Sequence, residues 1–232
     1  MTDLIEEQRF HNCVAIFSDR AAAGRLLAEK LEPYNTPSAI VLAIPSGGVP
    51  VGKEIAGHLH CDFDLLIVRK AQIPWNTEAG FGAVNMDGDI IINEPLVQTL
   101  RLTKDEIADQ LQITKDTLRK RTKLFRREKG FPDLAGRTVI LVDDGLASGY
   151  TMLIAIRYVK KRQPAKIIVA VPTGMSDTVA SILQESDAVV CLNIRDTYPF
   201  AVASAYENWY DLTDAEVLKL MNFNPLTGSK NH

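Results

Sequence analysis

Short, uninterrupted runs of apolar residues recur along the chain and are separated by segments with helical spacing. They cover residues 39–44, 62–68, 139–142, 165–171 and 187–192. Runs without polar alternation are typical of strands that are buried on both faces, as in a parallel sheet covered by helices. Because crossovers between parallel strands are right-handed, we expect an α/β fold with a twisted sheet, helices on both faces and loops along one edge.

Capping residues and spacing predict the helices between these strands. They cover residues 18–31 with Ser18 as the cap, 51–59, 103–129, a segment from Tyr150, 176–185 with Ser176 as the cap, and a terminal helix from Thr213. Asp87-Gly88 predicts a hairpin over residues 82–93, and Thr103-Lys-Asp-Glu106 forms a capping box. We therefore expect one domain, residues 1–192, with the hairpin and the long helix inserted, followed by a tail over residues 193–232.

Length and composition fit one domain with a small appendage. The chain has 232 residues, is 46% hydrophobic and carries a net charge of −3, so nothing global indicates a nucleic-acid or anionic-membrane partner. Cys13, Cys61 and Cys191 are odd in number and far apart, which disfavours a disulfide framework and a zinc site. No run approaches the roughly 20 apolar residues of a membrane span, and no secretion signal is visible. We expect a cytoplasmic protein with reduced cysteines.

The predicted long helix carries a strongly basic face. Its cations are Lys115, Arg119, Lys120, Arg121, Lys123, Arg126 and Arg127. A nucleic-acid surface is one interpretation, but a solvated face is favoured because aromatic residues are not interleaved and the chain is acidic overall.

The run 139–142 ends in two acids and a loop of small residues. The stretch is Asp143, Asp144, Gly145, Leu146, Ala147, Ser148, Gly149, Tyr150 and Thr151. The glycines let backbone N–H groups converge on an anion, and the following helix N-terminus favours a phosphate. The carboxylates would repel that phosphate if they faced it, so we expect them to accept hydrogen bonds from vicinal hydroxyls of the same ligand. The stretch predicts a sugar-phosphate site, with an ordinary strand-to-helix turn as the alternative.

Four apolar residues followed by Asp-Asp and then Ser-Gly-x-Thr resemble the phosphoribosyl pyrophosphate (PRPP) motif of the type I phosphoribosyltransferases. The resemblance implies a Rossmann-like parallel twisted sheet with a small hood. It also implies an enzyme of nucleotide metabolism that transfers the 5-phosphoribosyl group of PRPP to a nucleophile, usually a nitrogen, and releases pyrophosphate. Residues 145–151 would hold the 5′-phosphate. Asp143 and Asp144 would act as catalytic residues that hold the ribose hydroxyls directly or through Mg²⁺.

A second glycine loop, Ser46-Gly47-Gly48, follows the run 39–44. On its own, this glycine loop is as readily explained by a plain tight turn as by a ligand-binding loop. In the resembled family the loop after the first strand binds pyrophosphate through its backbone, and Gly47 and Gly48 match it. The nearest group of uncharacterised members has Arg-Gly-Gly here, so Ser46 is a departure that removes a charge-assisted contact. The resemblance allows some cations of the long helix to reach pyrophosphate from the same or a neighbouring subunit.

Arg69 and Lys70 follow the run 62–68, at the edge where open α/β sheets place ligand contacts. Solvated surface charge is the alternative. The resemblance assigns both to catalysis and pyrophosphate binding, at the start of a mobile catalytic loop over residues 71–82. Trp75 in this loop would stack on a base or anchor the loop, and the sequence leaves both open.

The tail from residue 193 is rich in aromatic residues: Tyr198, Phe200, Tyr206, Trp209 and Tyr210. The resemblance suggests that it forms the hood over the acceptor, whereas packing against the last helix is an equally weighted alternative. The expected partners are PRPP and a small-molecule acceptor, a nitrogenous base being favoured, with no nucleic acid and no membrane. A PRPP-sensing regulator and a PRPP hydrolase stay open, and a homodimer is suggested because dimers are common in the family.

Overall fold

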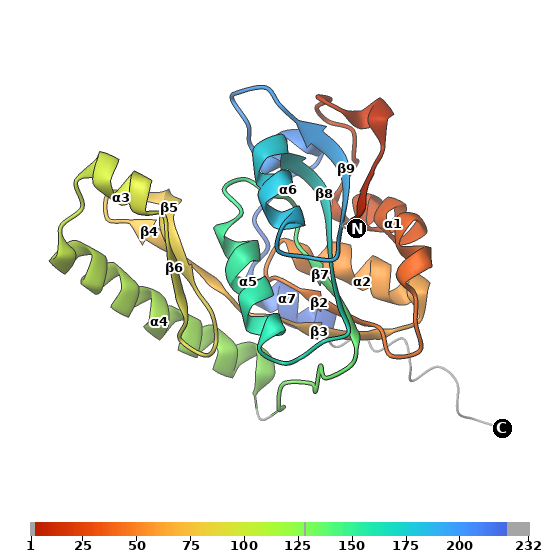
Figure 1. Ribbon diagram of the computed structural model, residues 1–232, viewed down its shortest axis with the longest axis horizontal. Helices are drawn as coiled ribbons and strands as arrows, with labels where there is room; N and C mark the ends of the chain where they lie inside the picture. Colours follow the sequence, from red (N-terminus) through yellow and green to blue (C-terminus); the bar gives the residue numbers. More distant parts are fainter. Residues whose placement is uncertain (1–2, 128, 222–232) are drawn as a thin grey trace.

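The core is a six-stranded, fully parallel sheet with strand order β1-β9-β8-β7-β2-β3 (Figure 1). The computed structural model describes residues 3–127 and 129–221. The strands are β1 (Asp3–Glu6), β2 (Ile40–Ala43), β3 (Asp62–Leu65), β7 (Thr138–Val142), β8 (Lys166–Met175) and β9 (Ala188–Arg195). The predicted α/β fold with a parallel sheet is confirmed.

Helices cover both faces of this sheet, as the uninterrupted apolar strands require. In β7, Val139 and Leu141 pack with α5 (Tyr150–Lys160) and α6 (Ser176–Leu183). Their neighbours Ile140 and Val142 pack on the opposite face with α1 (Arg20–Leu31) and α2 (Gly48–Leu59). Successive side chains of a strand point to opposite faces, so every residue of this run is buried.

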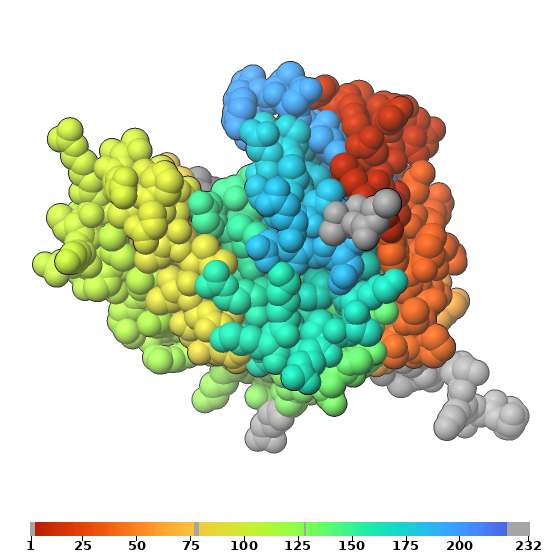
Figure 2. Space-filling model, in the orientation of Figure 1, coloured from red at the N-terminus to blue at the C-terminus, as the bar shows by residue number. Residues whose placement is uncertain are grey.

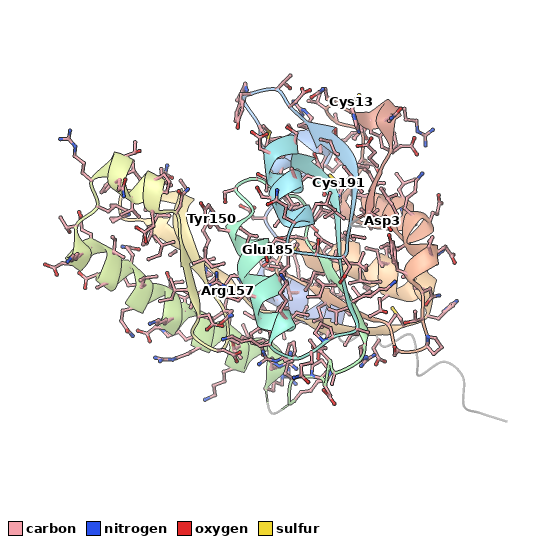
Figure 3. The ribbon with its side chains drawn as sticks, in the orientation of Figure 1. Asp3, Cys13, Tyr150, Arg157, Glu185 and Cys191 are labelled. Carbon is pink, nitrogen blue, oxygen red and sulfur yellow. The ribbon has the colours of Figure 1, made fainter. Side chains whose placement is uncertain are left out.

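A second sheet lies beside the core, at the left of Figure 1. Its antiparallel strands are β4 (Arg69–Ile73), β5 (Asn76–Val84) and β6 (Ile90–Ile92). Two helices pack on it, α3 (Glu94–Leu100) and α4 (Lys104–Arg126). Arg157 of α5 points toward this sheet (Figure 3) and donates a hydrogen bond to the Ile90 carbonyl at 3.4 Å, which joins the two parts.

The predicted hairpin over residues 82–93 is confirmed by the β5–β6 pairing, with Gly88 in its turn at φ +85°. The expectation of an irregular loop over residues 71–82 is wrong, whereas the mobility and catalytic role expected of this segment stay predictions. Those residues form the β4–β5 hairpin, with its turn at Pro74 and Trp75. The physical reason is that Ala71, Ile73 and Phe81 are buried in one cluster against the helices of this sheet, so strand pairing there gains apolar burial.

Helix ends agree with the sequence only in part. The capping box of α4 is formed, since the Thr103 hydroxyl accepts from the Glu106 N–H at 3.2 Å, but the helix ends at Arg126 instead of residue 129. Asp19, not Ser18, caps α1 by accepting from the Ala22 N–H at 2.7 Å. No side chain caps α6, so Ser176 is not its cap. The strand β1 and the helix α3 were not predicted.

The segment after β9 returns over the core beside the N-terminal residues, at the top of Figure 2. It contains the short helix η3 (Val202–Ala205), and the N–H of Ala15 donates to the Ser204 carbonyl at 2.8 Å. Two other short helices, η1 (Gln8–Phe10) and η2 (Glu32–Tyr34), precede and follow α1. The terminal helix α7 (Asp214–Met221) confirms the helix expected from Thr213. Residues 222–232 of the predicted tail lie outside the described residues.

The described part of the chain can be compared with two further expectations, which concern membrane spans and the state of the cysteines. Within it, no helix is long and apolar enough to cross a membrane. All three cysteines are free thiols; Cys191 is buried, whereas Cys13 and Cys61 are half-buried. Burial raises the pKa of the Cys61 thiol to about 11, so that thiol is protonated at neutral pH.

Candidate functional site

The loop after β7 lies at the carboxyl edge of the sheet, and it is anchored to the next strand. The N–H of Leu146 donates to the Thr173 carbonyl at 2.8 Å, and the Leu146 carbonyl accepts from the N–H of Met175 at 3.1 Å. The Leu146 side chain is buried. Of the residues predicted to hold a phosphate, Leu146 is therefore an anchor whose N–H is already used, which corrects its predicted role as a ligand contact.

The rest of this loop has the geometry of an anion site. Gly149 adopts φ +75°, a left-handed conformation that favours glycine, and it directly precedes α5. Ala147 and Ser148 are exposed, and the Thr178 hydroxyl of α6 fixes the loop by donating to the Ala147 carbonyl at 2.7 Å. The first turn of α5 carries no acidic residue. Its N–H groups and helix dipole therefore favour an anion next to Ser148.

The acid pair is tied to the beginning of α1 and to the tail. Arg20 donates from Nε to Asp144 Oδ2 at 2.9 Å and from Nη1 to the Tyr210 carbonyl at 2.9 Å. Its guanidinium also stacks on Trp209, 3.8 Å from the ring centre. The Tyr206 hydroxyl donates to the Asp144 backbone carbonyl at 2.6 Å. Both the side chain and the backbone of Asp144 are thus held by contacts from distant parts of the chain.

Burial raises the pKa of Asp143 well above its usual range, and the neighbouring Asp144 carboxylate raises it further. Burial also raises the pKa of Asp144, but the Arg20 guanidinium opposes that shift. Both acids therefore hold a proton more readily than an exposed carboxyl, and Arg20 makes Asp143 the preferred site of that proton.

The glycine loop before α2 touches the acid pair, because β2 and β7 are neighbouring strands. A Cβ on Gly47 would overlap the Asp144 carboxylate, and one on Gly48 would lie 2.6 Å from the Val142 carbonyl oxygen. The peptide bond that begins this loop, between Pro45 and Ser46, is cis. The structure thus brings together two loops that are nearly a hundred residues apart in the sequence.

One guanidinium group contacts the glycine loop, and a second lies within electrostatic range of the first. Arg121 of α4 donates from Nη2 to the Ser46 hydroxyl at 2.9 Å and to Asp214 Oδ1 at 2.8 Å. Burial and the Arg121 charge lower the pKa of Arg69, whereas Asp214 raises it, so Arg69 is within electrostatic range of both residues. The predicted role of Arg69 in pyrophosphate binding stays a prediction.

Lys70 is placed differently. It follows Arg69 on β4, and adjacent side chains of a strand point to opposite faces. A Cβ on Gly80 would overlap the Lys70 side chain, so Lys70 lies across β5. The predicted cation pair is therefore divided between the two faces of the small sheet.

The sequence did not assign Arg20 or Asp214 to the site, and it named Arg121 only among the helix cations that could reach pyrophosphate and Tyr206 only among the aromatics of the hood. One signal pointed to Arg20, because a cation in the first turn of a helix opposes the helix dipole and requires a local partner. Arg121 gave no such signal, since it is one of seven cations on the same helix. Tyr206 and Trp209 stack on each other, with ring centres 5.3 Å apart, and Tyr206 also packs on Phe17. These two aromatics thus pack near α1 and the acid pair, which corrects the alternative that they pack the last helix.

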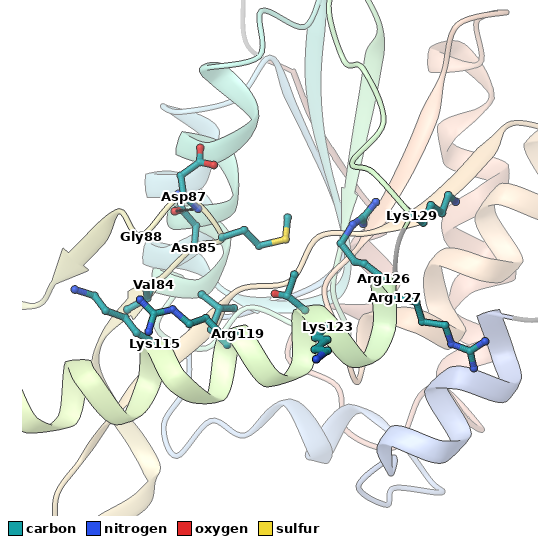
Figure 4. Close-up of a pocket in the computed structure, with 13 residues that line it drawn as sticks. Val84, Asn85, Asp87, Gly88, Lys115, Arg119, Lys123, Arg126, Arg127 and Lys129 are labelled. Atoms are coloured by element: carbon teal, nitrogen blue, oxygen red, sulfur yellow. Dashed lines mark hydrogen bonds between the residues drawn. The ribbon is translucent and has the colours of Figure 1, made fainter.

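A cavity of about 530 Å³ lies away from this site, between the 85–88 turn and the C-terminal half of α4 (Figure 4). Its cations include Arg126, which is paired with Asp64 at 3.2 Å. Asp87 on its wall is paired with Arg162 at 3.0 Å. None of the predicted site residues lines it, so the cavity is separate from the acid pair.

Among the described residues, no group of three or more acidic, histidine or cysteine side chains could hold a metal ion. Mg²⁺ needs less, because it commonly takes one or two carboxylates and completes its shell with water and substrate phosphates. Asp143 and Asp144 provide such a pair of oxygen ligands, so the residues present fit a Mg²⁺ ion that is bound together with a phosphate ligand.

Comparison with known families identifies the domain. Residues 16–207 match the family model described as Phosphoribosyl transferase domain. The match includes α1, both loops and the second sheet, and ends before α7.

Individual relatives agree. A Mycobacterium tuberculosis protein that is provisionally named a phosphoribosyl transferase, found in strains CDC 1551 and H37Rv, is 35% identical over 209 residues. The alignment covers 89% of this chain and 46% of that protein, so the chain spans about half the length of the curated relatives it matches. The crystal structure of TT1426 from Thermus thermophilus is 33% identical, with a TM-score of 0.70, over 88% of this chain and 97% of that one.

Proposed function

The chain belongs to the phosphoribosyl transferase domain family, and we propose that it transfers the 5-phosphoribosyl group of PRPP to a small-molecule acceptor and releases pyrophosphate. The observation that carries this proposal is the contact between Gly47 and the Asp144 carboxylate, which leaves no room for a Cβ. It supports a single ligand that spans the glycine loop, the acid pair and the α5 N-terminus. PRPP has a diphosphate, a vicinal diol and a 5′-phosphate in that order.

Each group of PRPP has a proposed partner. The loop 147–151 binds the 5′-phosphate through N–H groups and the Ser148 and Thr151 hydroxyls. Asp143 and Asp144 accept hydrogen bonds from the ribose hydroxyls. Gly47 presents its backbone N–H to the diphosphate and Arg69 adds a cation, whereas the Gly48 N–H donates to the Ile44 carbonyl at 3.0 Å and shapes the loop. These assignments rest on the loop geometry and on the burial of Arg69 near Arg121, which contacts the glycine loop.

The reaction needs no covalent enzyme intermediate. The C1–O bond to pyrophosphate breaks, positive charge develops at C1, and an acceptor nitrogen forms the new C–N bond and loses its proton. The developing negative charge lies on the leaving diphosphate, where prearranged N–H groups and a guanidinium lower the barrier. Mg²⁺, when bound, neutralises part of that charge.

The acceptor is proposed to be a nitrogenous base that is covered by the tail. Trp209 is partly exposed and Tyr210 is exposed, and both contact Arg20, the partner of Asp144. Tyr210 makes this contact through its backbone carbonyl, so the exposed ring beside the acid pair is that of Trp209. Such a ring suits a flat heterocycle, because it stacks with little loss of side-chain freedom. This supports the predicted hood function for residues 193–221.

A PRPP-sensing regulator was the alternative suggested by the missing arginine before Gly47. Arg121 weakens that argument, because its guanidinium lies 2.9 Å from the Ser46 hydroxyl and supplies a cation at this loop. Catalysis is therefore the function that these contacts support best.

Calorimetric titration of PRPP with Mg²⁺ tests the binding step. The wild type is expected to bind, and Asp144→Asn to lose at least tenfold in affinity, equivalent to about 1.4 kcal/mol. Asp116→Asn, an exposed acid on α4, is the matched control and is expected to bind like the wild type. Thermal unfolding of each variant checks that it is folded.

A pyrophosphate-release assay over a set of nitrogenous bases then separates the functions. Release that requires one base supports the transferase. Release without any acceptor shows a hydrolase, and binding without release shows a sensor. Absence of PRPP binding to the folded wild type would contradict all three.

A further inference from the structure

We propose that Arg121 is a pyrophosphate-binding residue and that Asp214 of α7 occupies its guanidinium until the anion displaces that carboxylate. This rests on the proposed function, because it assigns a residue and a competitor to the diphosphate end of the same site. The family match ends at residue 207, so α7 and Asp214 lie beyond it.

The position of Arg121 is the first argument. Its side chain crosses from α4 to the first residue of the Ser46-Gly47-Gly48 loop, and Nη2 contacts both the Ser46 hydroxyl and Asp214. The side chain is only 12% exposed. Its Nε is buried and has no hydrogen-bond partner among the described residues. A guanidinium has five N–H donors, so this one retains donors for an oxyanion at the loop.

The local charge is the second argument. Burial and the neighbouring Arg121 charge lower the pKa of Arg69, and Asp214 is the acid that opposes this shift. Two partly buried guanidiniums against one carboxylate leave a net positive charge beside backbone N–H groups. A diphosphate carries several negative charges and matches the forked geometry of arginine, so it would neutralise this excess better than one carboxylate.

The exposure of Asp214 shows how the exchange takes place. Its side chain is 44% exposed, and it lies in the first turn of α7. The helix itself is fixed, because Val217 is fully buried in a cluster with Val49 of α2 and Leu118 of α4. The Thr213 N–H donates to Glu216 at 2.8 Å and closes the helix start. Asp214 therefore leaves Arg121 by a side-chain rotation, and its carboxylate stays favourable at the helix N-terminus.

The competition predicts opposite effects for the two partners. Inorganic pyrophosphate, titrated calorimetrically with Mg²⁺, is expected to bind Arg121→Gln at least tenfold more weakly than the wild type. It is expected to bind Asp214→Asn about three- to tenfold more tightly, because the competing carboxylate is gone. Arg119→Gln is the matched control, since Arg119 is an exposed cation of the same helix and pairs with Asp116. Its affinity for pyrophosphate should stay within twofold of the wild type.

Ribose 5-phosphate is the second probe, because it carries the 5′-phosphate and the diol but no diphosphate. Its affinity should be the same in the wild type, Arg121→Gln and Asp214→Asn. If ribose 5-phosphate binds normally while Arg121→Gln binds pyrophosphate like the wild type, the inference is overturned and the proposed function stands. Weaker or unchanged pyrophosphate binding by Asp214→Asn overturns the proposal that Asp214 competes with pyrophosphate for Arg121. A folded wild type that binds neither probe overturns the proposed function together with this inference.

Discussion

Two ion pairs flank the candidate site, and they differ in how far the side chains of their partners are exposed to solvent. Arg20 and Asp144 are 7% and 16% exposed, and Arg20 is also held by the Tyr210 carbonyl and the Trp209 ring. In the second pair Arg121 is 12% exposed but Asp214 is 44% exposed. A buried pair is costly to open because a desolvated charge remains, whereas a pair with an exposed partner separates easily. The first pair is thus part of the fold, and the second is suited to exchange with a ligand.

The largest expected effect comes from breaking the buried pair. Arg20→Met should lower the free energy of unfolding by about 3 kcal/mol, because it leaves Asp144 without its counter-charge. Arg25→Met, on the same helix but in an exposed pair with Glu54, should cost less than about 1 kcal/mol. Urea unfolding measures both. Equal costs for the two variants would contradict the distinction between the pairs.

A second test acts on the close contact between Gly47 and the Asp144 carboxylate, which joins the glycine loop to the acid pair. Gly47→Ala would place a methyl group on the Asp144 carboxylate, so the loop must move and PRPP affinity should fall at least tenfold, or about 1.4 kcal/mol. Gly57→Ala in α2 is the control, because a Cβ there meets nothing. Its binding should be unchanged. Calorimetry with PRPP gives both values, and normal binding by Gly47→Ala would show that the loop tolerates separation from Asp144.

The third effect depends on pH. The folded chain retains a proton on Asp143 at pH values where the unfolded chain, with a pKa of roughly 3.9, has lost it. The free energy of unfolding therefore falls as pH rises from the unfolded pKa through the raised folded pKa. Asp143→Asn should remove the part of this decline that comes from Asp143, so its stability relative to the wild type should be higher at pH 8 than at pH 4. A difference independent of pH would mean that Asp143 titrates normally.

The smallest effect is expected at the exchangeable pair. Asp214→Asn should change the free energy of unfolding by less than about 1 kcal/mol, because the lost partner is half in water. Chemical unfolding measures it against Arg20→Met. A loss as large as that of Arg20→Met would make Asp214 a structural residue instead of a competitor for ligand.

The difference between local and distant contacts explains which features could be predicted from the sequence. The run 139–142 and the residues that follow it carry their signal locally, so the central strand, the acid pair and the helix start were found from one stretch. Arg69 was assigned to the site because parallel strands end at a common edge, although it begins β4 of the antiparallel sheet instead. These features depend on residues that are neighbours in the chain.

Other features depend on distant contacts. Arg121 is 75 positions from Ser46, and no local pattern distinguishes it from the other cations of its helix. Arg20 is 124 positions from Asp144, so its place in the first turn of a helix indicates a need for a partner but not which one. The β4–β5 hairpin was missed because its burial comes from helices that follow it in the chain. The sequence assigned Leu146 to phosphate binding, because the hydrogen bonds that tie its backbone to β8 can be seen only in the structure.

The attachment of Leu146 to β8 has a consequence for deuterium labelling. Its amide is bonded to the Thr173 carbonyl in the buried sheet, so it should exchange slowly with solvent whether or not a ligand is present. The exposed amides of Ala147 and Ser148 should exchange fast and slow down only when an anion binds. The loop thus contains its own reference signal, against which occupancy can be followed residue by residue.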